Sequence, residues 1–179
     1  MRIVAGEFRG RQLKSPTWEG LRPTSDRLRE TLFNILGPSV REARVMDGYA
    51  GTGAIGIEAI SRGAAEVTFV ERDPRAITLI EANLAALGAT GVIMRAGLAE
   101  AVTRLSGQVF DLIILDPPYA DTAAAQALDA VQSLASAGAR VVVEHASRHA
   151  APAERGGLRL TRTVKAGDSA LSFYEPFSL

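Results

Sequence analysis

The 179-residue chain contains no cysteine, two histidines and one tryptophan. Without cysteine it has no disulfide, no thiolate nucleophile and no zinc–thiolate site, which fits a cytoplasmic protein. No apolar run approaches the length needed to cross a bilayer, and the opening MRIVAGEFRGRQ lacks the apolar stretch of a secretory signal. The formal net charge is zero, so the whole chain has no field that attracts nucleic acid.

The charge is nevertheless uneven along the chain. Residues 1–14 carry four basic side chains against the single acid Glu7, a local charge of +3, and Arg22, Arg27 and Arg29 follow. Glycines and prolines punctuate residues 1–23, which predicts an extended arm or a small hairpin. A basic segment of this kind is often only a solvated edge, yet it also suits contact with nucleic acid. The candidate RNA-contacting residues of the arm are Arg9, Arg11 and Lys14.

The remaining residues predict an α/β domain. TSDRLRETLFNILGP predicts a helix that Thr24 or Ser25 caps and that Gly37-Pro38 ends. From Arg44 onward, β-rich runs alternate with helical stretches, which predicts a parallel sheet covered on both faces. The β-rich runs are RVMD, EVTFVE, GVIMR, FDLIILD and ARVVVEH, and the helical stretches are 53–62, 74–87, 98–106 and 122–136. LRLTRTVKA and SALSFYEP then predict a hairpin that adds an antiparallel strand.

A glycine-rich loop follows the first strand of the domain. Residues 51–56 read GTGAIG and match the GxGxxG pattern, and Glu71 stands twenty residues past Gly51 at the end of the second strand. Because this pattern places glycines near a ligand and an acid near a ribose, binding of a nicotinamide dinucleotide is one interpretation. A single glycine match is weak, since tight turns between a strand and a helix also favour glycine.

Asp47 favours a different ligand. A diphosphate would be repelled by a carboxylate at the tip of the first strand, whereas an ammonium or sulfonium group would be attracted to it. Asp47-Gly48-x-x-Gly51-x-Gly53 is also the pattern that enzymes using S-adenosylmethionine (SAM) place after their first strand. Capping of the following helix is the alternative role for Asp47. The candidate cofactor residues of these two strand ends are Asp47, Ala50, Gly51, Thr52, Gly53, Glu71 and Arg72.

The fourth strand ends in Asp116-Pro117-Pro118-Tyr119, which should face the glycine loop across the point where the strand order reverses. This motif suits methylation of an exocyclic amine. The Asp116 carboxylate and the Pro117 carbonyl can each accept one amine hydrogen and direct the nitrogen lone pair at a methyl donor. Pro118 stiffens the turn, and Tyr119 offers a face on which a base can stack. These four residues are therefore the candidate catalytic residues.

The acid also bears on the identity of the base. Guanine presents two neighbouring donors, N1–H and N2–H, and one carboxylate can accept both. Adenine presents an acceptor at N1, although a carboxylate could still hold its amine. Asp116 therefore favours guanine N2 as the methylated atom, and adenine N6 remains an alternative.

These motifs together resemble the RsmD family of bacterial SAM-dependent methyltransferases, which modify one guanine N2 of 16S ribosomal RNA. The resemblance covers nearly the whole chain and is carried by MRIVAGEFRGRQL, LRPTSDRLRETLFNIL, DGYAGTGAIGIEAISRGA, DPPY and GDSALSFYEP. It implies a Rossmann-like, mostly parallel sheet of seven strands with a C-terminal antiparallel hairpin and a small N-terminal extension. The implied division is residues 1–37, the basic arm and helix, and residues 38–179, the methyltransferase domain.

The resemblance also implies the partners and further contacts. It places Arg22, Thr24 and Arg27 beside the catalytic pocket, where they help to present RNA. After the third strand the chain reads MRAGLAEA and lacks the acid that many SAM enzymes have there, so adenine contacts are expected from the backbone near Gly97 and Leu98. We expect a cytoplasmic monomer that uses SAM, releases S-adenosylhomocysteine, needs no metal and acts on 16S rRNA within the small ribosomal subunit or its assembly intermediates.

Three other functions share part of this sequence evidence. The first is an adenine-N6 methyltransferase of DNA or RNA, which shares the DPPY motif. The second is a non-catalytic protein that binds SAM and RNA, which the complete DPPY motif disfavours. The third is a nicotinamide-dependent oxidoreductase, which titration with SAM and with NADH would distinguish.

Overall fold

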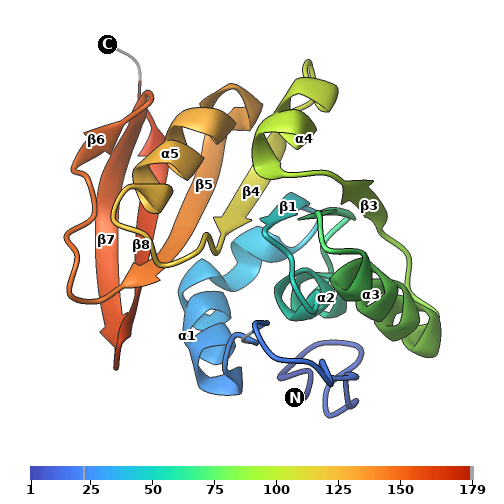
Figure 1. Cartoon of the computed structure of the whole chain (residues 1–179). Coiled ribbons are helices and arrows are strands. Elements are labelled where there is room, and N and C mark those ends of the chain that lie inside the picture. Colours follow the sequence, from blue (N-terminus) through green and yellow to red (C-terminus); the bar gives the residue numbers. More distant parts are fainter. Residues whose placement is uncertain (22, 178–179) are drawn as a thin grey trace.

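The computed structural model describes residues 1–21 and 23–177. The strands are β1 (Arg44–Gly48), β2 (Glu66–Glu71), β3 (Val92–Arg95), β4 (Phe110–Leu115), β5 (Ala135–Ala146), β6 (Glu154–Arg155), β7 (Leu158–Ala166) and β8 (Ser169–Pro176). The α-helices are α1 (Asp26–Leu36), α2 (Ala54–Ser61), α3 (Pro74–Leu87), α4 (Leu98–Arg104) and α5 (Ala123–Val131). Two short 3₁₀ helices cover residues 37–40 and 132–134. All the strands form one sheet in the order β3-β2-β1-β4-β5-β8-β7-β6 (Figure 1).

The topology confirms the predicted Rossmann-like fold. Strands β1 to β5 are parallel, and β8 and β7 add the antiparallel hairpin. The sheet formed by the described residues has eight strands rather than seven, because the two-residue β6 pairs with the start of β7. None of the helices within the described ranges is both long and apolar enough to span a membrane.

The largest difference between a predicted and an observed element boundary lies between α5 and β5. The helix expected over 122–136 ends at Val131 and passes through a 3₁₀ turn, so that β5 already begins at Ala135. Ala135 pairs with Phe110 of β4, and a register shift between Phe110 and Leu112 accommodates the additional residues. The alanine-rich composition predicted a helix here, and pairing with β4 overrides that local preference.

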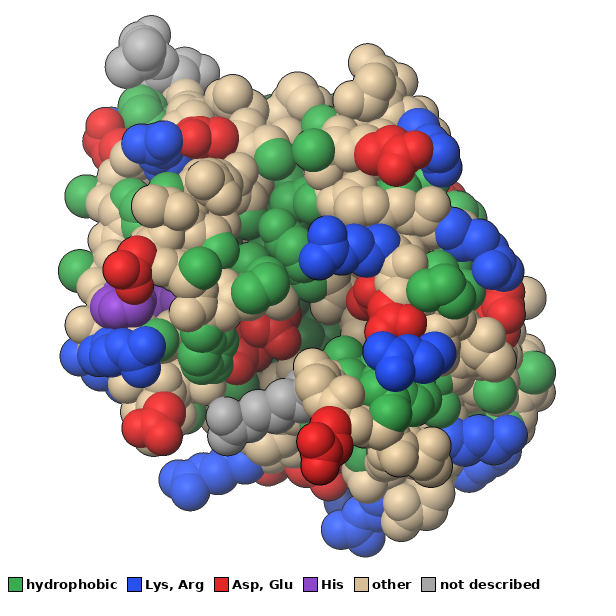
Figure 2. Space-filling view, viewed as in Figure 1, with side chains coloured by type: hydrophobic (Ala, Val, Ile, Leu, Met, Phe, Trp, Pro, Cys, Tyr) green, Lys and Arg blue, Asp and Glu red, His purple; other side chains and the backbone are tan. Residues whose placement is uncertain are grey.

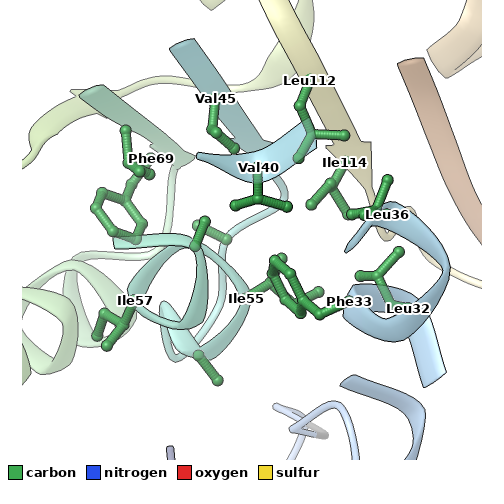
Figure 3. Close-up of a cluster of buried hydrophobic side chains, with 14 of the residues drawn as sticks. Leu32, Phe33, Leu36, Val40, Val45, Ile55, Ile57, Phe69, Leu112 and Ile114 are labelled. Carbon is green, nitrogen blue, oxygen red and sulfur yellow. The ribbon is translucent and has the colours of Figure 1, made fainter. Parts of the chain in front are cut away.

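Helices cover both faces of the sheet. Buried side chains of α1, α2 and α3 pack against one face, and those of α4 and α5 pack against the other. The alternation along β1 shows the two sides, since Val45 belongs to the first cluster and Met46 to the second. Figure 3 shows the first cluster, in which Phe33 of α1 and Ile55 of α2 lie below Val45 and Ile114 of the sheet.

The N-terminal arm folds back on itself and is attached to this first layer. Arg2 and Gln12 form an antiparallel bridge, which agrees with the predicted small hairpin. The backbone N–H groups of Val4 and Ala5 donate to the two carboxylate oxygens of Glu58 on α2, at 2.9 and 3.0 Å. Gly6 has a φ of +83° and lies so close to α2 that a Cβ atom would fall 1.8 Å from a backbone oxygen. The arm is therefore packed against the body of the protein and continues into α1.

Candidate active site

A pocket of about 460 Å³ lies at the carboxyl ends of the central strands. It sits where the strand order reverses, because β1 lies between β2 and β4 in the sheet. Open α/β sheets bind their ligands at this position. Figure 2 shows the face of the molecule hollowed at its centre, with acidic side chains inside the hollow and basic side chains on its rim.

The loop after β1 forms one wall of the pocket and is held by Glu71. Gly51 has a φ of +56°, and its N–H donates to Glu71 Oε2 at 2.8 Å. A Cβ atom on Gly51 would also approach a side-chain carbon of Leu21 to 3.2 Å, so glycine serves both the turn and the close approach. Glu71 Oε1 accepts the N–H groups of Arg72 and Asp73 at 2.8 and 2.9 Å. The Glu71 carboxylate thus fixes the loop while it lines the pocket.

Asp47 lies beneath this wall. Its side chain is 2% exposed, and Oδ2 accepts the N–H of Gly56 in the first turn of α2 at 2.9 Å. Burial raises the pKa of Asp47 well above its usual value, against the lowering effect of the Gly56 hydrogen bond. Asp47 is not among the residues that line the pocket. Its observed contact supports the N-terminus of α2, which Gly53 leaves without a side-chain cap, and direct contact with a cofactor stays a prediction.

The opposite wall is formed by Asp116, Pro117, Pro118 and Tyr119, which all line the pocket. Burial is the main cause that raises the pKa of Asp116 to about 8, and the charge of Glu144 adds to it. The hydroxyl of Tyr119 donates to Glu144 Oε1 at 2.9 Å and lies 2.6 Å from Ser169 Oγ. Tyr119 as a whole residue is 42% exposed, so its hydroxyl is held while much of the residue stays accessible.

A third wall comes from the segment that joins the arm to α1. Leu21, Pro23, Thr24 and Ser25 line the pocket, and Ser25 also caps α1 by accepting the N–H of Leu28 at 3.1 Å. Thr24 therefore lies beside the catalytic candidates, where the resemblance places it.

Two contacts hold the start of this segment on α3. The guanidinium of Arg75 lies 5.1 Å from the ring centre of Trp18. The backbone N–H of Lys14 donates to Asn83 Oδ1 at 2.7 Å. These contacts fix the chain just before the third wall on α3, although none of the four residues lines the pocket.

The structure brings together only some of the candidate residues. Ala50, Gly51, Thr52, Glu71 and Arg72 line the pocket with the four catalytic candidates. The candidate residues that lie elsewhere in the described chain are Asp47, Gly53, Gly97 and Leu98 of the cofactor set and Arg9, Arg11, Lys14 and Arg27 of the RNA set.

The outlying candidates on α4 and on the basic segment have the following positions. Gly97 is the N-cap of α4, and Leu98 packs into the core on that face. The basic candidates are exposed, although Arg11 donates to the Ala86 carbonyl oxygen of α3 at 2.9 Å. Arg22 lies outside the described residues.

Sequence reasoning missed Glu144 and Ser169, which both line the pocket. Glu144 is an acid at the carboxyl end of a parallel strand, as are Asp47, Glu71 and Asp116. A search for acids at every such strand end would have found it. Ser169 begins β8 and reaches the site only through the antiparallel pairing of β8 with β5, for which the local sequence holds no signal.

Comparisons with known proteins identify the family to which this chain belongs. The family described as Conserved hypothetical protein 95 matches residues 1–175. The chain is 41% identical to Ribosomal RNA small subunit methyltransferase D of Haemophilus influenzae over 132 residues, covering 72% of this chain and 68% of that protein. It is also 41% identical to the Escherichia coli K12 protein of the same name, covering 66% of this chain and 60% of that protein.

Two further similarities extend over nearly the full chain. YlbH of Bacillus subtilis, named as a candidate rRNA methyltransferase, is 35% identical, with 98% of each chain covered. The solved structure of yhhF from Escherichia coli is 32% identical and covers 98% of this chain and 97% of that chain, with a TM-score of 0.87. The chain therefore belongs to the Conserved hypothetical protein 95 family, in agreement with the RsmD-family resemblance of its motifs.

Proposed function

We propose that this chain is a SAM-dependent methyltransferase that modifies the exocyclic N2 of a guanine in 16S ribosomal RNA. The observation that carries the proposal is the DPPY turn facing a glycine loop across an acidic pocket at the switch point of the sheet. Relatives named Ribosomal RNA small subunit methyltransferase D, at 41% identity, support rRNA as the substrate. The site chemistry and the relatives favour the same class of enzyme.

The pocket residues fit SAM in size and charge. A volume of about 460 Å³ lies within the range of small-ligand pockets. The half-buried carboxyl of Asp116 and the buried carboxylate of Glu144 make the site favourable for a cation. When bound, SAM supplies a methyl group on a positively charged sulfur. Glu71 and the backbone of the Gly51 loop would hold its adenosine, and the ribose hydroxyls would donate to Glu71.

Asp116, Pro117 and Tyr119 would prepare the acceptor. The ionised Asp116 carboxylate and the Pro117 carbonyl oxygen each accept one hydrogen of the target amine, which orients the nitrogen lone pair. The two prolines restrict the turn, so the carbonyl has little freedom to move away. The accessible ring of Tyr119 offers a stacking surface for the base that carries the amine.

Guanine is the favoured base because the pocket wall that carries Asp116 offers hydrogen-bond acceptors. Asp116 and the nearby Glu144 accept hydrogen bonds when ionised, and the Watson–Crick edge of guanine presents donors at N1 and N2. The N1 atom of adenine would face these oxygens with a lone pair. Methylation of adenine N6 in DNA or RNA is the second candidate, since the DPPY turn alone could hold that amine.

Residues 1–37 would dock the RNA, and residues 38–179 would carry the chemistry. The exposed basic side chains of the arm and of α1 can contact phosphates, while Thr24 and the unplaced Arg22 would act beside the pocket. We infer a monomer that works in the cytoplasm on the small subunit or its assembly intermediates. S-adenosylhomocysteine would be the second product, with no metal required.

The test is to incubate the purified protein with isotopically labelled SAM and small ribosomal subunits from cells that lack it. Mass spectrometry of the digested RNA should detect one labelled N2-methylguanosine, and the Asp116→Ala variant should give none. Label in N6-methyladenosine would favour the second candidate. Absence of label from free 16S RNA, intact subunits and assembly intermediates alike would reject the rRNA methyltransferase assignment.

A further inference from the structure

Glu144 is a buried acid that lines the pocket with the catalytic candidate Asp116. It follows Val143, which pairs with Leu115 in the β4–β5 register, so Glu144 stands beside Asp116 where the two strands end. Ile114 and Val142 both face the α1–α3 layer, and by alternation Asp116 and Glu144 face the same side. Both residues line the pocket. The fold thus places two carboxyl groups together on one wall.

The two oxygens of Glu144 have different surroundings. Oε1 accepts the hydroxyl hydrogen of Tyr119 at 2.9 Å. Oε2 is buried and has no hydrogen-bond partner among the residues that the structure describes, and the residue as a whole is 8% exposed. A buried carboxylate oxygen without a partner is costly, so it marks a group whose partner arrives with a ligand or whose charge acts on a neighbour.

The other charged groups around Asp116 are mostly of the same sign. Asp47 comes from the end of the neighbouring strand β1 and Glu71 from the end of β2, which is the next strand beyond it. Arg72 lines the pocket as a basic side chain. Burial raises the pKa of Asp116 to about 8, and Glu144 is the charged neighbour that adds to the rise. Loss of the Glu144 charge therefore makes ionisation of Asp116 easier, while the effect of burial remains.

We propose that Glu144 is a positioning residue for the methyl transfer, which fixes the ring of Tyr119 through one oxygen and controls the charge state of Asp116 through its own charge. This inference rests on the proposed function of the same site. Asp116 accepts a hydrogen from the target amine only as a carboxylate. With Glu144 beside it, Asp116 stays neutral until a positive charge enters the pocket. The carboxylate form of Asp116, which can hold the amine, is therefore present only when SAM is bound.

The same residue defines the position of the stacking ring. Tyr119 is an exposed residue that ends the DPPY turn, and its hydroxyl contacts are with Glu144 and Ser169 of the C-terminal strands. Without them the ring would be free to leave the pocket, and a flipped base would lose its platform. The strand pair β5–β8 thereby supports a catalytic turn that follows β4.

The test uses three variants. Glu144→Gln removes the charge and keeps an oxygen that can accept from Tyr119. Tyr119→Phe removes the hydroxyl and keeps the ring. Glu175→Gln, the same change at an exposed position of β8, is the matched control. For each variant we would measure the unfolding temperature of the free protein from pH 5.5 to 9, and the methylation rate of small subunits over the same range at saturating SAM.

Because the folded pKa of Asp116 is raised, its contribution to stability is present at low pH and is lost as the pH rises through about 8. The unfolding temperatures of the wild type and of Glu175→Gln should fall as the pH rises from 5.5 to 9, and that of Glu144→Gln should fall less. The acidic limb of the pH–rate profile of Glu144→Gln should lie about one pH unit lower than that of the wild type. Tyr119→Phe should leave the limb in place and raise KM for the RNA more than it lowers kcat.

Two results overturn the inference. One is a folded Glu144→Gln variant whose stability and rate follow pH as in the wild type, and the other is a Tyr119→Phe variant with an unchanged KM. If the wild type itself methylates no ribosomal RNA, the proposed function fails. The unfolding series on the free protein still decides whether Glu144 controls Asp116.

Discussion

Two clusters of charged side chains in this molecule differ in the signs of the charges that they bring together. Around Glu58 the charges are opposite, because its carboxylate accepts from the guanidinium groups of Arg29 and Arg62 as well as from the N–H groups of Val4 and Ala5. Arg29 Nε is nevertheless buried without a hydrogen-bond partner among the described residues. The side chains of Arg29 and Glu58 are both fully buried. At the pocket, Asp116 stands beside Glu144, and one Glu144 oxygen has no partner among the described residues.

The difference indicates that one cluster attaches the N-terminal arm and that the other belongs to the functional site. Opposite charges join three parts of the chain, namely the arm, α1 and α2. Like charges that raise a pKa in a pocket indicate a site that a ligand completes. The first cluster therefore explains how a basic arm is fixed to the body, and the second explains why a cationic methyl donor would be bound.

The largest expected effect is at the pocket, in Asp116→Ala. Methylation should fall at least about a thousandfold, because the variant removes the acceptor that orients the amine. SAM affinity should stay within a few-fold of the wild type, measured by calorimetry. Wild-type turnover in the variant would show that Asp116 does not hold the amine.

Arg29→Ala tests the paired cluster. It leaves the buried Glu58 without one of its two guanidinium partners, so the free energy of unfolding should fall by about 3–5 kcal/mol in a urea titration. Arg27→Ala, at an exposed position of the same helix, is the control and should change stability by less than about 0.5 kcal/mol. Equal stability of the two variants would contradict the role of the cluster as the attachment of the arm.

Glu71→Ala tests the cofactor wall. Glu71 holds the Gly51 loop and is expected to accept from the ribose of SAM, so losing its charge-assisted hydrogen bonds should cost about 1.5–3 kcal/mol. SAM affinity should drop roughly tenfold to a hundredfold by calorimetry. An unchanged affinity in a folded variant would remove Glu71 from the cofactor site.

The smallest effect is expected on the arm. Replacing Arg9, Arg11 and Lys14 with alanine should weaken the methylation of small subunits several-fold and flatten its dependence on salt. SAM affinity serves as the internal control and should not change. Because Arg11 already donates to the Ala86 carbonyl, its share of the effect should be below that of the other two. Identical salt slopes for the triple variant and the wild type would mean that the arm is only a solvated edge.

The sequence predicts the features that depend on local pattern. The five parallel strands, the hairpin and the positions of Gly51, Glu71 and Asp116 follow from hydrophobic runs that end in glycine or an acid. These residues meet in the fold because parallel strands end at one edge of a sheet. A pattern of strand ends is thus sufficient to place two walls of the candidate site, the glycine loop with Glu71 and the DPPY turn.

What the sequence does not predict depends on contacts between distant segments. Ser169 meets Tyr119 only because β8 pairs with β5, and Glu58 meets the arm across more than fifty positions. The sequence also does not predict the direction in which a side chain points. Asp47 stands at the predicted strand end, yet its carboxylate turns to the N–H of Gly56. Local patterns carry no information on such pairings.

Proton release on cofactor binding is the most direct test of the idea that this acidic pocket binds a cationic methyl donor. At pH 7 the Asp116 carboxyl, with its pKa raised to about 8, is mostly protonated, and a positive charge beside it lowers that pKa. Calorimetric titration of SAM in two buffers of different ionisation enthalpy should therefore show release of part of a proton per SAM bound, about one third to one half. S-adenosylhomocysteine, which lacks the sulfonium charge, should release less. Binding of SAM without proton release, or no binding of SAM at all, would contradict it.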